Sequence, residues 1–86
     1  MMTYEHLLAQ TIAEVMGIAP DSVSRSRSFF EQGMDSLAGL RICRRLGDHL
    51  GFEVDIEWVF DHPTIDLLAS FLRERAAEAG IAPVAP

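Results

Sequence analysis

Residues 35–51, DSLAGLRICRRLGDHLG, carry the pattern that decides the fold. At about 100° per residue, small and apolar side chains recur on one helical face and charged side chains on the opposite face. The first face holds Leu40, Cys43, Leu46, Gly47 and Leu50, with Ile42 at its edge. The second face holds Arg41, Arg44, Arg45 and Asp48. The stretch predicts a helix from about Asp35 to Leu50 that stops at Gly51.

Helical periods also occur on both sides of this stretch. Before it, Thr3 is suited to cap the start of a helix and Gly17 to end it in a left-handed conformation. After it, Thr64 follows Pro63 at the start of a helix that Gly80 closes. The first apolar stripe holds Tyr4, Leu8, Ile12 and Val15, with Leu7 and Met16 at its margins. The second holds Ile65, Leu68, Leu72 and Ala76, broadened by Leu67 and Phe71.

Two irregular connections join the three predicted helices. Residues 18–34 contain Pro, Gly and five Ser or Asp residues, and so predict a long ordered loop, a feature that is usually functional in a compact domain. Its apolar residues are expected to anchor it to the core, namely Ile18, Val23, Phe29 and Phe30. In residues 52–62, Asp55 is suited to cap one short helical turn that ends before Pro63. We expect Trp58 and Phe60 of this segment to be core residues as well.

The fold class that follows is all-α: a four-helix bundle with three longer helices, one short helix and a long first loop. The 86 residues suit one small domain, because a single core divides only in much longer chains. We expect residues 1–86 to be that domain, with a core at about 4–79 and a flexible tail at 80–86.

Composition excludes several functional classes. Thirteen acidic and seven basic residues give a net charge of −6, whereas nucleic-acid binding needs a basic surface. Cys43 is the only cysteine, so an internal disulfide is excluded. No apolar run approaches the ~18 residues of a membrane span, and the first residues lack the pattern of a signal peptide. His6 and His49 show no metal-ligand spacing. We expect a cytoplasmic monomer that binds neither nucleic acid, membrane nor metal.

Ser36 and Leu37 are the candidate functional residues of the second helix. Ser36 lies at the mouth of the predicted helix, where free backbone N–H groups favour an anionic group. Leu37 projects into the polar face, which makes it a candidate contact for a partner. Each has a structural alternative, since Asp35 or Ser36 is suited to be a simple N-cap and a single exposed leucine needs no explanation.

The run from residue 29 to 72 resembles an acyl carrier protein of polyketide synthase type. Residues 33–37, GMDSL, match the family's Gly-x-Asp-Ser-Leu motif, and residues 60–64, FDHPT, match the motif that opens its last helix. The preceding residues 15–29 also suit the family's first helix end and loop. The chain departs from the family's usual pattern at Arg25, Arg27 and Asp55.

The resemblance implies that a phosphopantetheinyl transferase attaches 4′-phosphopantetheine from coenzyme A to Ser36. The thiol of that arm would hold an acyl or aminoacyl group as a thioester, and Asp35 would help to seat the helix end and the transferase. Acyltransferase, ketosynthase or adenylation-type loading enzymes would act on the cargo. The chain itself would be a non-catalytic carrier.

The predicted partner surface combines one apolar residue with basic residues of the second helix. It consists of Leu37, Arg41, Arg44, Arg45 and, on the short helix, Val59. A partner would therefore present a small apolar socket ringed by acidic groups, because complementary rim charges raise the association rate.

Three alternatives remain at this point. A peptidyl carrier of nonribosomal peptide synthesis shares the fold, although such carriers more often have Gly-Gly-x-Ser before the leucine. An unmodified helical interaction module would have the same fold with a free Ser36. A hydrolase using Ser36 with His49 or His62 is disfavoured, because GMDSL lacks the Gly-x-Ser-x-Gly elbow.

Overall fold

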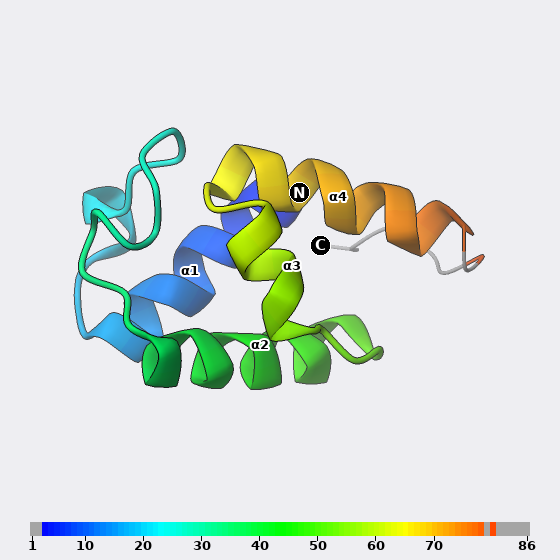
Figure 1. Cartoon of the computed structure of the whole chain (residues 1–86), viewed down its shortest axis with the longest axis horizontal. Coiled ribbons are helices and arrows are strands. Elements are labelled where there is room, and N and C mark those ends of the chain that lie inside the picture. The colour runs from blue at the N-terminus through cyan, green and yellow to red at the C-terminus, as the bar shows by residue number, and fades with distance from the viewer. Residues whose placement is uncertain (1–2, 79, 81–86) are drawn as a thin grey trace.

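The computed structural model describes residues 3–78 and 80, which contain four α-helices and one 3₁₀ turn joined by loops (Figure 1). The elements are α1 (Tyr4–Met16), η1 (Pro20–Ser22), α2 (Ser36–Leu50), α3 (Ile56–Asp61) and α4 (Ile65–Glu78). This confirms the all-α architecture with three longer helices and one short one. The long first loop contains the turn η1, which the sequence did not predict.

The helix starts lie where the capping residues predict them. The side chains of Thr3, Asp35, Asp55 and Thr64 each accept a hydrogen bond from a backbone N–H of the following turn. Such caps satisfy donors that the helix cannot satisfy itself. Gly17 and Gly51 end α1 and α2 with φ of 71° and 79°, a left-handed conformation that glycine adopts without steric cost.

The core lies where α1 packs against both α2 and α4, while α3 contacts α2. Among its fully buried side chains are Leu8, Leu46, Ile65 and Leu72. The two helices approach closely at Gly39, where a Cβ atom would lie only 2.9 Å from Ile56 Cδ1. The start of α3 therefore lies close to Gly39 of α2.

Some apolar side chains that were predicted to be buried are exposed instead. They are Ile18, Phe30, Leu40, Phe60 and Leu67. In α2 the buried face is centred on Ile42 and Leu46, so Ile42 lies inside and Leu40 lies outside. The helical period of α2 predicted the approximate direction of its buried face but not its width.

Two predictions concern the ends of the chain and membrane insertion. The predicted tail, 80–86, lies outside the described residues apart from Gly80, whose φ of 71° is left-handed. Within residues 3–78 and 80, no helix is long and apolar enough to cross a membrane.

Candidate functional site

Ser36 is the first residue of α2 and is exposed. Asp35 is the N-cap: its side chain accepts a hydrogen bond from the backbone N–H of Ala38 at 2.8 Å. The Asp35 carbonyl also accepts from the N–H of Gly39 at 2.9 Å. The cap therefore does not engage the Ser36 hydroxyl. The N-cap alternative is therefore confirmed for Asp35, and this cap leaves the Ser36 hydroxyl unengaged.

The loop before Ser36 is fixed by buried residues on either side of a turn. Phe29 and Met34 are buried, and the Met34 N–H donates to the Phe29 carbonyl at 3.1 Å. Gly33 between them has φ of 99°, which a residue with a Cβ rarely adopts. The glycine of the GMDSL motif thus turns the chain sharply so that Asp35 and Ser36 emerge at the surface.

Gln32 holds the rest of the loop together, a role that sequence reasoning missed. Its Oε1 accepts from the Ser24 N–H at 2.7 Å, and its Nε2 donates to the carbonyls of Ser24 and Arg27 at 3.1 and 3.0 Å. With a longer bond from Nε2 to the Ser28 carbonyl at 3.4 Å, one amide side chain contacts four backbone groups of a segment that has no regular structure. No sequence period marks such a residue, because the bonds depend on the loop's path.

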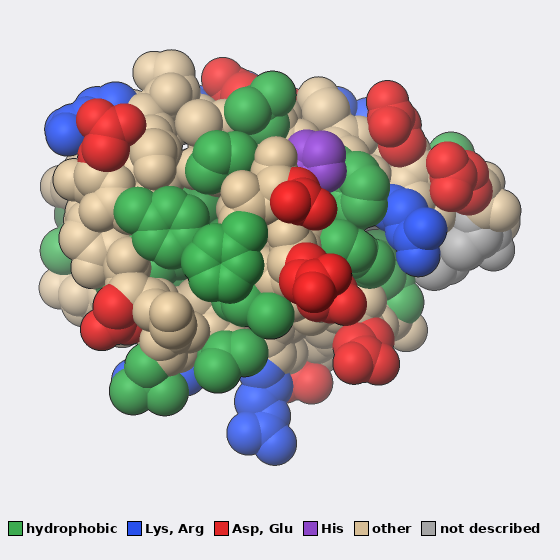
Figure 2. All heavy atoms as spheres, in the orientation of Figure 1, with side chains coloured by type: hydrophobic (Ala, Val, Ile, Leu, Met, Phe, Trp, Pro, Cys, Tyr) green, Lys and Arg blue, Asp and Glu red, His purple; other side chains and the backbone are tan. Residues whose placement is uncertain are grey.

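Exposed apolar side chains gather next to Ser36 on the loop, α2 and α3. Leu37 is 65% exposed, Leu40 is 52% exposed, and Phe30 and Phe60 stack with ring centroids 5.3 Å apart. We call these four residues the apolar patch. Figure 2 shows hydrophobic side chains clustered over α3 and the neighbouring loop, continuing down to the start of α2. Four of the six large exposed hydrophobic residues of the described chain belong to this patch.

Charges of both signs border the patch. Arg41 and Arg44 are exposed on α2, whereas Glu57 and Asp61 are exposed on α3. In Figure 2, acidic side chains lie beside the hydrophobic cluster on the α3 side and basic side chains at its α2 edge. A partner that covers the patch therefore meets basic groups along one edge and acidic groups along the other.

A family comparison agrees with this geometry. The family described as "Phosphopantetheine attachment site" matches residues 6–72, which contain Ser36 and the whole apolar patch. The chain belongs to this carrier family. Its members carry a covalently attached 4′-phosphopantetheine group.

The relatives of this carrier domain come from both polyketide and nonribosomal peptide synthases. Erythronolide synthase EryA2 of Saccharopolyspora erythraea is 39% identical over 70 residues, covering 80% of this chain and 2% of that protein. A plipastatin synthase polypeptide of Bacillus subtilis is 36% identical over 70 residues, covering 81% and 2%. This chain thus spans a very small part of these synthases.

Solved structures confirm the carrier fold. A free-standing peptidyl carrier protein from an Acinetobacter baumannii secondary metabolic pathway has a TM-score of 0.79 and 25% identity. The match covers 84% of this chain and 90% of that one. This chain is therefore a carrier domain of the kind found in polyketide and nonribosomal peptide synthases, a class whose members are non-catalytic.

The residues of this carrier domain fit a phosphopantetheine arm at Ser36. The hydroxyl is exposed and is not used by the helix cap, and Ser36 lies at a helix start, where backbone N–H groups favour an anion. Gly33 and Asp35 set the backbone, and the apolar patch borders the serine. A phosphodiester at this position would face solvent rather than the core.

Two residues of the predicted partner surface lie elsewhere in the carrier domain. Val59 is only 1% exposed and packs into the core, so its assignment as a contact residue is wrong. Because α3 has only six residues, its sequence period was too short to fix which side chain faces outward, and Phe60 does so instead. Arg45 lies on the α1 side of α2, where its Nη1 is 2.9 Å from Glu14 Oε2.

Cys43 has a structural role in the carrier domain, as expected. It is buried at the edge of an open groove of about 820 Å³ between α2 and residues 51–56. Burial, with a smaller contribution from Asp55, raises the pKa of the Cys43 thiol to about 11. The thiol therefore stays protonated at neutral pH and is a poor nucleophile. Among the described residues, no cluster of three or more His, Cys, Asp or Glu side chains is arranged to hold a metal ion.

Proposed function

We propose that Ser36 is the attachment residue of the 4′-phosphopantetheine arm and that the domain delivers acyl groups between enzymes of polyketide-type biosynthesis. The observation that carries this proposal is the exposed hydroxyl of Ser36, which Asp35 leaves unengaged at the start of α2. The family match supports it, because residues 33–37 supply the motif that surrounds the attachment serine.

The chain's own residues prepare the serine and leave the chemistry to partners. Ser36 Oγ would displace 3′,5′-ADP from coenzyme A and lose its proton to a base of the transferase, forming a phosphodiester. Asp35 caps the first turn of α2, and the free N–H groups of that turn would stabilise the charge of the phosphodiester. Once attached, the arm would supply a thiol that holds the cargo as a thioester, and the covalent tether would raise the effective concentration of that cargo at each partner within its reach.

Polyketide-type partners are favoured over peptide-synthetase partners by residues 33–37 and 60–64. Met34-Asp35 replaces the Gly-x pair that peptidyl carriers more often have, and FDHPT suits acyl carriers. A peptidyl carrier remains the second candidate, because a free-standing peptidyl carrier is structurally similar at a TM-score of 0.79. Loading of holo protein by acyltransferases rather than by adenylation enzymes would separate the two.

The apolar patch is the proposed docking surface for these partners, with Arg41 and Arg44 at one edge. Compared with the partner surface predicted from the sequence, this surface still contains Leu37. It contains Phe60 instead of Val59, and it also includes Leu40 and Phe30. Such docking would be weak and salt-sensitive, as suits a carrier that must leave one enzyme to reach the next. We further propose that the domain is a monomer. We also propose that it acts in the cytoplasm, where coenzyme A and the transferase are available.

The experiment that tests the attachment residue is intact-mass measurement after incubation with coenzyme A and a broad-specificity phosphopantetheinyl transferase. Wild type should gain the mass of one phosphopantetheinyl group. Ser36→Ala should gain none, while Ser26→Ala, which removes an exposed hydroxyl of the preceding loop, should load like wild type. An unmodified wild-type chain would favour the interaction module instead.

A further inference from the structure

The loop before Ser36 is joined to the corner between α3 and α4 at three successive points. The Asp66 N–H donates to the Arg25 carbonyl at 3.2 Å, and the Phe29 N–H donates to the Pro63 carbonyl at 2.7 Å. The third point is the stack of Phe30 on Phe60. The partners run in opposite directions along the chain, so residues 25–30 and 60–66 pair as two antiparallel segments.

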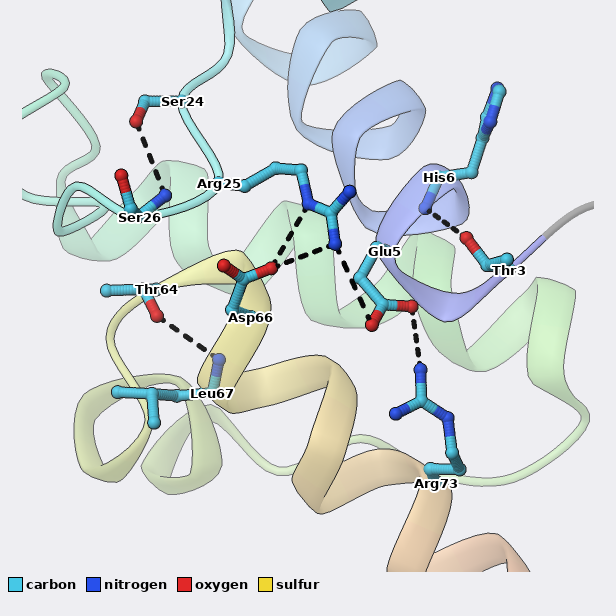
Figure 3. Close-up of polar contacts among 10 residues, drawn as sticks. All are labelled: Thr3, Glu5, His6, Ser24, Arg25, Ser26, Thr64, Asp66, Leu67 and Arg73. Carbon is cyan, nitrogen blue, oxygen red and sulfur yellow. Dashed lines mark hydrogen bonds and ion pairs between the residues drawn. The ribbon is translucent and has the colours of Figure 1, made fainter.

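Side chains hold the two segments together at Arg25 and Asp66, the end of the pairing away from the Phe30 and Phe60 rings. Arg25 Nε donates to Asp66 Oδ1 at 3.1 Å, and a terminal nitrogen of Arg25 lies 3.0 Å from the same oxygen (Figure 3). That guanidinium also lies 3.9 Å from Glu5 Oε2, and Glu5 Oε1 pairs with Arg73 at 2.6 Å. The segment 25–30 is thereby attached to α1 as well as to α4.

The other end of the pairing forms half of the apolar patch. Phe30 and Phe60 are both exposed, so little core packing fixes their orientation. Their positions follow from the backbone of the two paired segments, because the main-chain bonds at 25–66 and 29–63 set how the loop lies against the corner. A contact at Arg25 can therefore affect the surface beside Ser36.

We propose that Arg25 and Asp66 are positioning residues that act through the Phe30–Phe60 pair to present the docking surface beside Ser36. This inference rests on the proposed function, since it concerns how partners recognise that serine. The ion pair is exposed, with side chains 59% and 53% accessible, so its effect is modest. Pairs of this kind correspond to about a two- to fivefold change in an equilibrium constant.

A purely structural role for Arg25 would have different consequences. It would lower the melting temperature and leave the transferase reaction of the folded protein unchanged. A positioning role changes KM with kcat unchanged, because docking is altered but the reacting hydroxyl is not. A positioning role also acts through the Phe30 and Phe60 rings. The effect of an Arg25 substitution on KM should therefore vanish when the stacked pair has been removed.

The experiment is a double-mutant cycle of Arg25→Gln and Phe30→Ala on the full chain, with transferase kinetics measured against coenzyme A as co-substrate. Arg25→Gln should raise KM for the carrier about two- to fivefold, with kcat unchanged. Asp66→Asn should do the same, and amide exchange at Phe29 and Asp66 should speed up by a similar factor. In the Phe30→Ala background, Arg25→Gln should have no further effect on KM.

The matched control is Arg27→Gln, which removes the same charge two residues away, where no ion pair with the described residues is found. It should leave KM unchanged, and an equal rise in both variants would overturn the inference in favour of a general charge effect. Additive effects of Arg25→Gln and Phe30→Ala would also overturn it. If wild type itself is not loaded, the proposed function fails, and loading of wild type with unchanged variants refutes the inference alone.

Discussion

Replacing Leu46 and Phe60 by alanine should affect stability very differently, although their sequence patterns made both core residues. Leu46 is 0% exposed in the centre of the α2 face, whereas Phe60 is 47% exposed. Leu46→Ala removes buried methyl groups and leaves a cavity, at a cost of about 2–5 kcal/mol. Phe60→Ala loses roughly half of the ~1.5–3 kcal/mol that full burial of its side chain would contribute, plus part of the stack with Phe30. We expect a loss of about 1–2 kcal/mol.

Urea denaturation followed by circular dichroism measures both losses directly. The cost at Leu46 is comparable to the whole stability of a small domain, so Leu46→Ala should be largely unfolded near 37 °C. Phe60→Ala should unfold cooperatively, with an unchanged slope and a modestly lower midpoint. Leu67→Ala is the control, since Leu67 is exposed and is not one of the four patch residues. Equal losses for Leu46 and Phe60 would refute the assignment of Phe60 to the surface.

Further predictions concern packing, pH and docking. Gly39→Ala should leave the stability within about 1 kcal/mol of wild type, because the new methyl group meets only the flexible end of Ile56 and alanine favours a helix over glycine by about 1 kcal/mol; a thermal melt that shows a loss of several kcal/mol would mean that Ile56 cannot move aside. Hydrogen bonding to Arg73 lowers the pKa of Glu5, so Glu5 stabilises the fold above its unfolded pKa of about 4.3 and this stability is lost as pH falls through the lowered value. Urea midpoints measured from neutral to acid pH should therefore fall more steeply for wild type than for Glu5→Gln. Leu40→Ala should raise the transferase KM, whereas Leu67→Ala, at the same 52% exposure, should not; equal KM values would remove Leu40 from the docking surface. Substituting Arg41 and Arg44 with Glu should slow cargo transfer by a native partner more at low salt than at high salt, and rates equal to wild type across a salt series would contradict the role of α2.

The helices could be predicted from the sequence because their signals are local. Thr3, Asp35, Asp55 and Thr64 cap the first turn within three residues of themselves, and Gly17 and Gly51 need only a left-handed backbone. The assignment of Ser36 also rests on a local signal, a short motif whose residues are adjacent in the chain, and it stays a prediction.

The docking surface could not be predicted in the same way, because it depends on contacts between distant segments. Phe30 and Phe60 stack on each other only because the loop lies against the α3–α4 corner, thirty residues further along. Val59 and Phe60 are neighbours on a helix of six residues, where one turn cannot show which faces the core. Arg25 and Gln32 act through bonds set by the path of the loop, and no period or motif marks them.

The central claim is that Ser36 carries the arm, and tandem mass spectrometry of a tryptic digest tests it most directly. Cleavage after Arg27 and Arg41 releases residues 28–41, which contain both Ser28 and Ser36. After loading with coenzyme A and a broad-specificity transferase, this peptide should carry one phosphopantetheinyl group, and its fragments should place the group on Ser36. A group on Ser28, or on any peptide outside residues 28–41, would contradict the account.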